Sequence, residues 1–163
     1  MLFPLLVALL FLPVQERVEL EFPAHIENVA PAFSLYDLDA RLRHTSEFEG
    51  HAAIAIVFLN ADDATARRRE LKRLACASRK RDVELLVVDV TESIPTPRLR
   101  AQYRPLALGI PILFDENHTV ARRYLIEKTP TVCLLDRKNV IRYIGAMGAP
   151  LDKAVKQLTS VDR

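Results

Sequence analysis

Two short, continuous apolar runs constrain the fold of this chain more than any other feature. They span residues 53–59 and 83–90, and neither alternates polar with apolar positions. Strands that are covered by helices on both faces have this pattern, and such strands are usually parallel. The two runs therefore predict neighbouring parallel strands inside an α/β domain.

The segment between the runs, residues 63–81, is predicted to form one helix, because Leu71 and Ala75 fall on a single apolar stripe. Asp62 or Asp63 can accept the first free backbone amides as its N-cap. The remaining pattern predicts a short helix, three strands and a final helix at residues 98–104, 110–114, 131–135, 140–144 and 151–161. Alternating elements that end in two adjacent strands predict a mixed sheet flanked by helices.

Length and composition exclude several classes of protein. The 163 residues suit one domain with a proper core, and 50% hydrophobic with 27% charged residues is typical of an ordered globular chain. A net charge of +2 makes the whole molecule a weak polyanion binder. The four histidines are scattered, and no phosphate-binding loop occurs among only four glycines. We therefore expect neither a metal nor another cofactor.

The N-terminal residues 2–14 are uncharged and apolar apart from two prolines. They match the apolar part of a signal peptide and are shorter than the ~20 residues of a membrane-spanning helix. Export to the periplasm or the cell exterior is the expectation, with no transmembrane span. An uncleaved segment that tethers the protein to a membrane is one alternative, and a buried N-terminal strand or helix is another. Residues 15–29 would form a linker, in which 18–22 alternate like an edge strand.

Several segments follow one another in the order of a known family. They are residues 30–39 (APAFSLYDLD), 46–51 (SEFEGH), 109–115 (GIPILFD), 118–125, 129–131 (TPT) and 134–145 (LLDRKNVIRYIG). Together they resemble the redoxin family of alkyl hydroperoxide reductases, thiol-specific antioxidants and thioredoxin-like thiol-disulfide proteins. The resemblance covers residues 30–145 and implies a thioredoxin-like fold, a mixed sheet flanked by helices, for a domain at 30–163. Turn positions that are often glycine in that family are Ala40 and Asn139 here.

The chain departs from this family at the reactive centre. Redoxins carry their reactive cysteine where the first buried strand runs into a helix, and the matching stretch is residues 63–68. Asp63 stands at the cysteine position and Ala66 stands three residues further on. Neither cysteine nor serine occurs between Phe58 and Leu71. A carboxylate cannot pass through the sulfenate or disulfide states of a thiol, so the resemblance implies a redoxin domain without its catalytic residue.

The Thr-Pro element that faces the cysteine in thioredoxin-like proteins matches Thr129 and Pro130. The resemblance implies a cis bond before Pro130 and a substrate groove bordered by Asp62, Thr65, Thr129 and Pro130. From the residues alone, Asp63 is explained as a helix cap and Pro130 as the first residue of a strand. The structural and the binding interpretation of this element both stay open at the level of sequence.

Two cysteines remain elsewhere in the chain. Cys133 lies within the apolar run 131–135, where a free cysteine is normally buried and inert. Cys76 falls away from the apolar stripe of the predicted helix and has basic neighbours, among them Arg73 and Lys80. Because neighbouring cations favour the reactive thiolate, Cys76 is the candidate thiol for any remaining redox chemistry.

The predicted helix that contains Cys76 carries the densest charge of the chain. Between residues 64 and 81, eight basic residues face one acidic residue, Glu70. The basic residues are Arg67, Arg68, Arg69, Lys72, Arg73, Arg79, Lys80 and Arg81. A solvated helix face is the simple interpretation, and a docking surface for a protein or another anionic surface is the alternative. No aromatic residue is interleaved, so no specific nucleic-acid binding is expected.

Two functions are consistent with these observations. The first is a non-catalytic binding module that uses the groove near Asp63 and Pro130, or the basic helix. The second is a thiol-disulfide oxidoreductase or peroxidase that relies on Cys76. Rapid alkylation of Cys76 in the native protein would favour the enzyme, and slow alkylation would favour the binding module.

Overall fold

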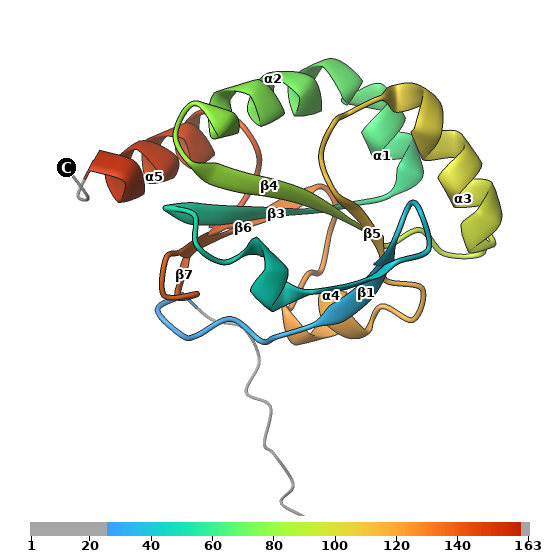
Figure 1. Cartoon of the computed structure of the whole chain (residues 1–163), viewed down its shortest axis with the longest axis horizontal. Coiled ribbons are helices and arrows are strands. Elements are labelled where there is room, and N and C mark those ends of the chain that lie inside the picture. Colours follow the sequence, from blue (N-terminus) through green and yellow to red (C-terminus); the bar gives the residue numbers. More distant parts are fainter. Residues whose placement is uncertain (1–25, 161–163) are drawn as a thin grey trace, which may run out of the picture.

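The computed structural model describes residues 26–160 and is built on a seven-stranded mixed sheet (Figure 1). The strand order is β2-β1-β5-β4-β3-β6-β7. The strands are β1 Ser34–Asp37, β2 Leu42–His44, β3 Ala53–Leu59, β4 Val83–Asp89, β5 Ile112–Phe114, β6 Thr131–Asp136 and β7 Ile141–Gly145. β3 and β4 are parallel neighbours, as the two apolar runs predicted. β5 continues the parallel centre, and the antiparallel hairpins β1-β2 and β6-β7 form the two edges.

Helices cover both faces of the sheet (Figure 1). They are α1 Ala61–Ala66, α2 Arg68–Arg79, α3 Thr96–Tyr103, α4 Thr119–Arg123 and α5 Ala149–Ser160, with short 3-10 turns η1 at Thr45–Phe48 and η2 at Arg104–Leu106. Side chains of β3 alternate between two apolar cores: Val57 and Leu59 pack with α1, α2, α3 and α5, whereas Ile56 and Phe58 pack with α4. Within residues 26–160 no helix is long and apolar enough to cross a membrane.

The predicted single helix 63–81 is wrong in two respects. The chain forms two helices, α1 and α2, which are separated at Arg67, whose φ of −102° and ψ of 16° leave the helical range. The cap is Asn60 and not Asp62 or Asp63, because β3 ends at Leu59 and leaves Asn60 extended at φ −98° and ψ 169°. Its side-chain oxygen accepts the backbone amide of Asp63 over 2.7 Å, so both aspartates lie within the first turn.

The hairpin β1-β2 was not predicted, because its strands are short and half exposed. Residues 27–29 lie against β7, where the amide of Glu27 donates to the carbonyl of Ile141 over 2.7 Å and Val29 forms a bridge with Val140. The predictions for residues 2–14 and 18–22 fall outside the described residues.

The two edge hairpins are closed by the same type of turn. In one, Oδ1 of Asp37 accepts the backbone amides two and four residues further along, over 2.9 and 3.0 Å. In the other, Oδ1 of Asp136 accepts the equivalent amides over 2.8 and 3.0 Å. Each turn contains a residue in the left-handed conformation, Ala40 at φ 60° and Asn139 at φ 59°. Asparagine adopts this conformation readily, whereas alanine is strained in it.

Candidate functional site

The site implied by the resemblance lies where the end of β3, the start of α1 and the start of β6 meet. β3 and β6 are antiparallel and pair Phe58 with Thr131, so Asn60 and Thr129 come together just beyond the paired residues. The amide Nδ2 of Asn60 donates to Oγ1 of Thr129 over 3.4 Å. The peptide bond between Thr129 and Pro130 is cis, as the resemblance implied.

Asp63 contacts this Thr-Pro element directly. Its carboxylate Oδ2 accepts a hydrogen bond from Oγ1 of Thr129 over 3.1 Å, while its own backbone amide donates to Asn60. Asp63 is half-buried, whereas Ala66 is exposed on the last turn of α1. A carboxylate, a hydroxyl and an amide therefore hold the start of α1 against the Thr129-Pro130 segment, with no thiol among them.

The other predicted groove residues surround this contact without joining it. Asp62 and Thr65 are exposed on α1, and the hydroxyl of Thr65 donates to the carbonyl of Ala61 within its own helix. Thr129 and Pro130 are half-buried. Among the described residues, the N-cap Asn60 and the α1 residue Asp63 have the side chains that bond Thr129.

A second hydrogen-bonded cluster lies at the end of β4. The Oγ1 atom of Thr91 accepts the backbone amide of Ala61 over 2.9 Å and donates to Oδ2 of Asp89 over 2.9 Å. The hydroxyl of Tyr103, from α3, donates to the same oxygen over 2.5 Å. Asp89 and Tyr103 are 2% and 1% exposed. β3 and β4 pair Leu59 with Asp89, so the cluster lies next to the end of β3. It holds Ala61, the first residue of α1, through the hydrogen bond from the Ala61 amide to Thr91.

Burial controls protonation in this cluster. Loss of solvation is the largest effect on Asp89 and raises its pKa, although the hydrogen bonds from Tyr103 and Thr91 oppose it. Burial also raises the pKa of Tyr103, and the negative charge of Asp89 adds to that effect. The phenol of Tyr103 therefore remains a hydrogen-bond donor at physiological pH, and the cluster acts as a structural support of α1.

A cavity of about 290 Å³ opens beside the cluster, at the carboxyl ends of β4 and β5. Its lining combines hydroxyl and carboxylate groups with apolar side chains, among them Thr91, Ile94, Leu99 and Phe114. Thr91 belongs both to this cavity and to the site, because its hydroxyl also bonds Ala61. The carboxyl ends of parallel strands are the usual place for ligands in open α/β sheets.

The predicted basic surface divides into three groups. Arg68 and Arg79 donate to the backbone oxygens of Leu106 and Gly109, over 2.9 and 2.6 Å, and so fasten α2 to the segment before β5. Arg67, at the break between α1 and α2, pairs with Glu70 in the first turn of α2 over 3.0 Å. The remaining five basic residues lie on α2 and just after it, and they are Arg69, Lys72, Arg73, Lys80 and Arg81.

The two cysteines lie away from the Asp63-Thr129 contact. Cys133 is completely buried in the centre of β6, and burial raises its pKa to about 12, so its thiol is inert as predicted. Cys76 is exposed in the last turn of α2, also as predicted. It borders an open surface hollow of about 600 Å³ that Arg73, Lys80 and Arg81 also line.

Sequence reasoning did not identify Asn60, Asp89, Thr91 or Tyr103 as parts of the site. A signal existed for Asn60, which is a strong capping residue directly after a buried strand. A signal also existed for Asp89, because an acid at the end of an apolar run needs a hydrogen-bond donor when it is buried. No pattern in the sequence links Tyr103 to Asp89, since the contact depends on how α3 packs.

Solved structures share this architecture. An uncharacterized conserved protein from Geobacillus kaustophilus superposes with a TM-score of 0.73 at 21% identity, over 84% of this chain and 83% of that chain. A thiol-disulfide oxidoreductase from Bacteroides fragilis gives 0.70 at 22% identity, over 80% of this chain and 99% of that chain. The thioredoxin domain of a thiol-disulfide oxidoreductase from Bacteroides vulgatus gives 0.70 at 16%, over 83% and 98%. The predicted thioredoxin-like fold is therefore confirmed.

The sequence profile of the AhpC/TSA family matches residues 26–144. The chain belongs to the AhpC/TSA family, which confirms the redoxin resemblance and extends it to Ile26, at the start of the described residues. No curated protein matches the sequence.

Proposed function

We propose that this member of the AhpC/TSA family acts by binding a polypeptide and has no thiol-based catalytic activity. The binding site is the surface around Asp63, Thr129 and Pro130. The observation that carries the proposal is the 3.1 Å hydrogen bond from Thr129 to the Asp63 carboxylate. In a redoxin, a thiol would face the Thr-Pro element at this place. Here the facing group is a carboxylate, which cannot be oxidised and reduced in turn.

The surroundings of this contact support binding. Two hydrogen bonds hold the start of α1 in position. Thr91 accepts the amide of Ala61, and Thr129 donates to the carboxylate of Asp63. Such a rigid support reduces the entropic cost of binding. The neighbouring cavity, which shares Thr91, has room for an apolar side chain of a bound polypeptide next to Ile94, Leu99 and Phe114.

The second candidate function is a thiol-disulfide oxidoreductase or peroxidase that uses Cys76. The observation in its favour is the exposure of this thiol beside Arg73 and Lys80. Two relatives in fold are described as thiol-disulfide oxidoreductases. Against it, Cys76 is in the last turn of α2, whereas Thr129 and Pro130 lie just before β6 and contact the first turn of α1. Export of the domain, which is based on the apolar residues 2–14, is a further part of the proposal.

Two measurements on the full chain test the proposal. Peroxide consumption and insulin reduction should not exceed those of a thiol-only control, in the parent and in Cys76→Ser alike. Titration of the ¹⁵N-labelled protein with reduced, carbamidomethylated lysozyme, a basic unfolded polypeptide, should shift the amide signals of Asp63, Thr129 and Thr131. Turnover that disappears in Cys76→Ser would establish the second candidate, and an absence of shifts around Thr129 would refute the binding site.

A further inference from the structure

One side of α2 presents a line of cations to solvent. Arg69, Arg73, Cys76 and Lys80 follow one another at intervals of four, three and four residues, and all four are exposed. Residues at these intervals share one face of a helix, which here extends over about 16 Å. We call these residues the cationic stripe of α2. The buried residues of the helix are Leu71, Ala75 and Ser78.

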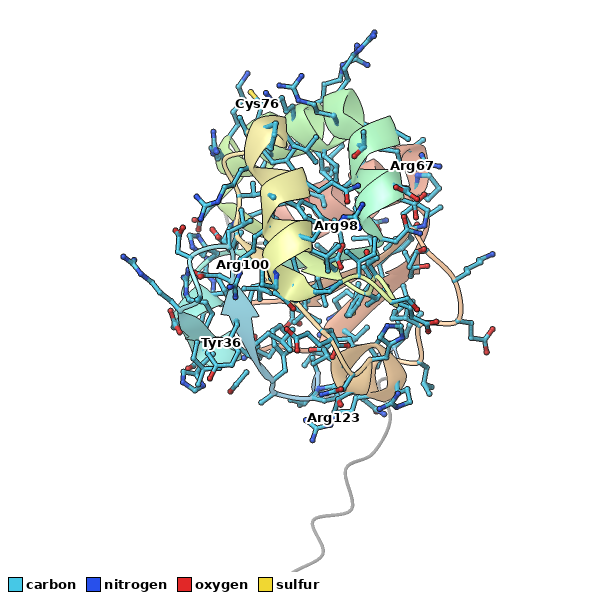
Figure 2. The ribbon with its side chains drawn as sticks, turned by 90° about the vertical axis from the view of Figure 1, so that its right-hand side faces the viewer. Tyr36, Arg67, Cys76, Arg98, Arg100 and Arg123 are labelled. Carbon is cyan, nitrogen blue, oxygen red and sulfur yellow. The ribbon has the colours of Figure 1, made fainter. Side chains whose placement is uncertain are left out.

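The cations of this stripe have no internal role among residues 26–160. Arg69, Arg73 and Lys80 make neither an ion pair nor a side-chain hydrogen bond there, in contrast to the neighbouring Arg68 and Arg79, which bond backbone carbonyls. The positive charge of the stripe is therefore not neutralised within the described domain. Figure 2 shows Cys76 at the outer surface of α2, among basic side chains that project into solvent.

The stripe ends in a shallow hollow. Cys76 and Ala77 border it together with Arg73, Lys80 and Arg81, and its volume is about 600 Å³. Two small residues between long cations create a depression that a side chain of a partner can enter. Carboxylates that follow the depression would meet guanidinium and ammonium groups on both sides of it.

We infer that the cationic stripe of α2 is a docking surface for an acidic segment of a partner protein. This inference is independent of the polypeptide site proposed at Asp63 and Thr129. Charge complementarity indicates an acidic partner, because Arg69, Arg73 and Lys80 lack carboxylates of their own in the described domain. Arg69 and Arg73, about 5–6 Å apart on the helix, match carboxylates three or four residues apart on a facing helix. Lys80, two turns beyond Arg73, matches a third carboxylate seven residues further along.

A membrane surface fits the stripe less well. Helices that lie on a bilayer insert a free apolar face, whereas the apolar residues Leu71 and Ala75 of α2 are already buried in the core. The exposed large hydrophobic residues of the described domain lie elsewhere and are Ile26, Val29, Tyr36, Leu42 and Leu125. Two of these residues, Ile26 and Val29, belong to the segment before β1, which lies beside β7 and across the sheet from α2 (Figure 1). They therefore do not add an apolar surface to the stripe.

Charge reversal with a matched control tests the inference. The probe is a fluorescent peptide of twelve glutamates, titrated with the full chain at low and physiological salt. The variant Arg69→Glu/Arg73→Glu/Lys80→Glu should bind about tenfold more weakly, because three attractions become repulsions. The control Arg41→Glu/Arg122→Glu/Lys138→Glu has the same change in net charge, placed on α4 and in the β1-β2 and β6-β7 turns. Its affinity should change less than about twofold. Equal losses in both variants would refute the inference.

The parent protein offers a second readout that needs no substitution. Because Cys133 is buried, a bulky maleimide labels the native chain at Cys76, in the centre of the stripe. The bound glutamate peptide should slow this labelling several-fold, and 1 M salt should abolish the protection. Labelling at an unchanged rate would refute the inference. Tighter binding to vesicles with 30% phosphatidylserine than to the peptide, lost in the stripe variant, would assign the surface to membranes instead.

Discussion

Thr129 donates its hydroxyl hydrogen to Oδ2 of Asp63 over 3.1 Å, across the junction between β6 and α1. Asp63 stands where the family resemblance expects the reactive thiol, and Thr129 precedes the cis proline of the same site. The two parts of the site are therefore joined by a hydrogen bond that does not depend on oxidation state. This relationship makes the position suitable for direct tests by substitution.

A cysteine introduced at Asp63 should be reactive. In a Cys76→Ser background, Asp63→Cys places a thiol in the first turn of α1, beside the Thr129 hydroxyl. A helix N-terminus and a hydrogen-bond donor both stabilise a thiolate. We expect it to react with a maleimide roughly three- to tenfold faster at pH 7 than Thr65→Cys, the exposed control on the same helix. Stopped-flow labelling measures both rates. Equal rates would indicate that the donors around Asp63 do not act on a thiolate.

Asn60 should contribute more to stability than Asp63. Asn60→Ala removes the side-chain oxygen that accepts the first-turn amide and should lower the free energy of unfolding by about 1 kcal/mol. Asn60→Ser should recover most of this loss. Asp63→Ala removes only the bond to Thr129 and should cost about 0.5 kcal/mol. Urea denaturation at pH 7 ranks the variants, and a larger loss for Asp63→Ala than for Asn60→Ala would contradict the capping assignment.

Ala40→Gly should stabilise the protein. Ala40 is exposed and held at φ 60°, where glycine avoids the clash of a β-carbon. We expect a gain of about 0.5–1 kcal/mol in the free energy of unfolding, after allowance for the greater chain entropy of glycine. Ala101→Gly is the matched control, because Ala101 is exposed within α3. This variant should lose about 1 kcal/mol in the free energy of unfolding. Thermal unfolding that shifts in the same direction for both variants would contradict the prediction.

Asp89→Asn should change how stability depends on pH. Burial raises the folded pKa of Asp89 against the opposing hydrogen bonds from Tyr103 and Thr91. The folded protein therefore holds a proton that the unfolded chain releases near pH 4, so stability falls as pH rises from that value through the folded pKa. The asparagine side chain does not titrate, so the variant does not lose this stability as pH rises. Its stability relative to the parent should increase between pH 4 and pH 7, and a constant difference in urea titrations would contradict the raised pKa.

The centre of the fold and its β6-β7 edge could be predicted from sequence, whereas the β1-β2 edge could not. The runs that became β3 and β4 are long and apolar, because helices cover both of their faces. β1 and β2 are short and half exposed, so their residues do not form a distinctive pattern. The break at Arg67 was missed because the apolar stripe continues from Ala64 to Leu71 across both helices.

Only part of the site could be predicted. The resemblance led to Asp63, Thr129 and Pro130, and the exposure of Cys76 was predicted from its place on the helix. The Asp89-Tyr103 contact could not be predicted, because it joins β4 to α3 and depends on tertiary packing. The sequence predicted a basic surface on this helix, but not that Arg68 and Arg79 bond carbonyls of another segment.

The two turns at Asp37 and Asp136 are places where low pH should destabilise the fold. Burial alone would raise the pKa of each carboxyl, but backbone amides together with Arg43 and Arg142 outweigh it and lower both values. The stability that these ionised groups supply is complete above the unfolded pKa near 4 and is lost as pH falls through the folded values.

The two turns lie at opposite edges of the sheet, whereas β3, β4 and β5 lie between them. Acid should therefore open the sheet from both margins inward, as two local unfolding units around a protected centre. Amide hydrogen exchange near pH 3 would reveal this order: β2 and β7 should lose protection together, well before β3 and β4.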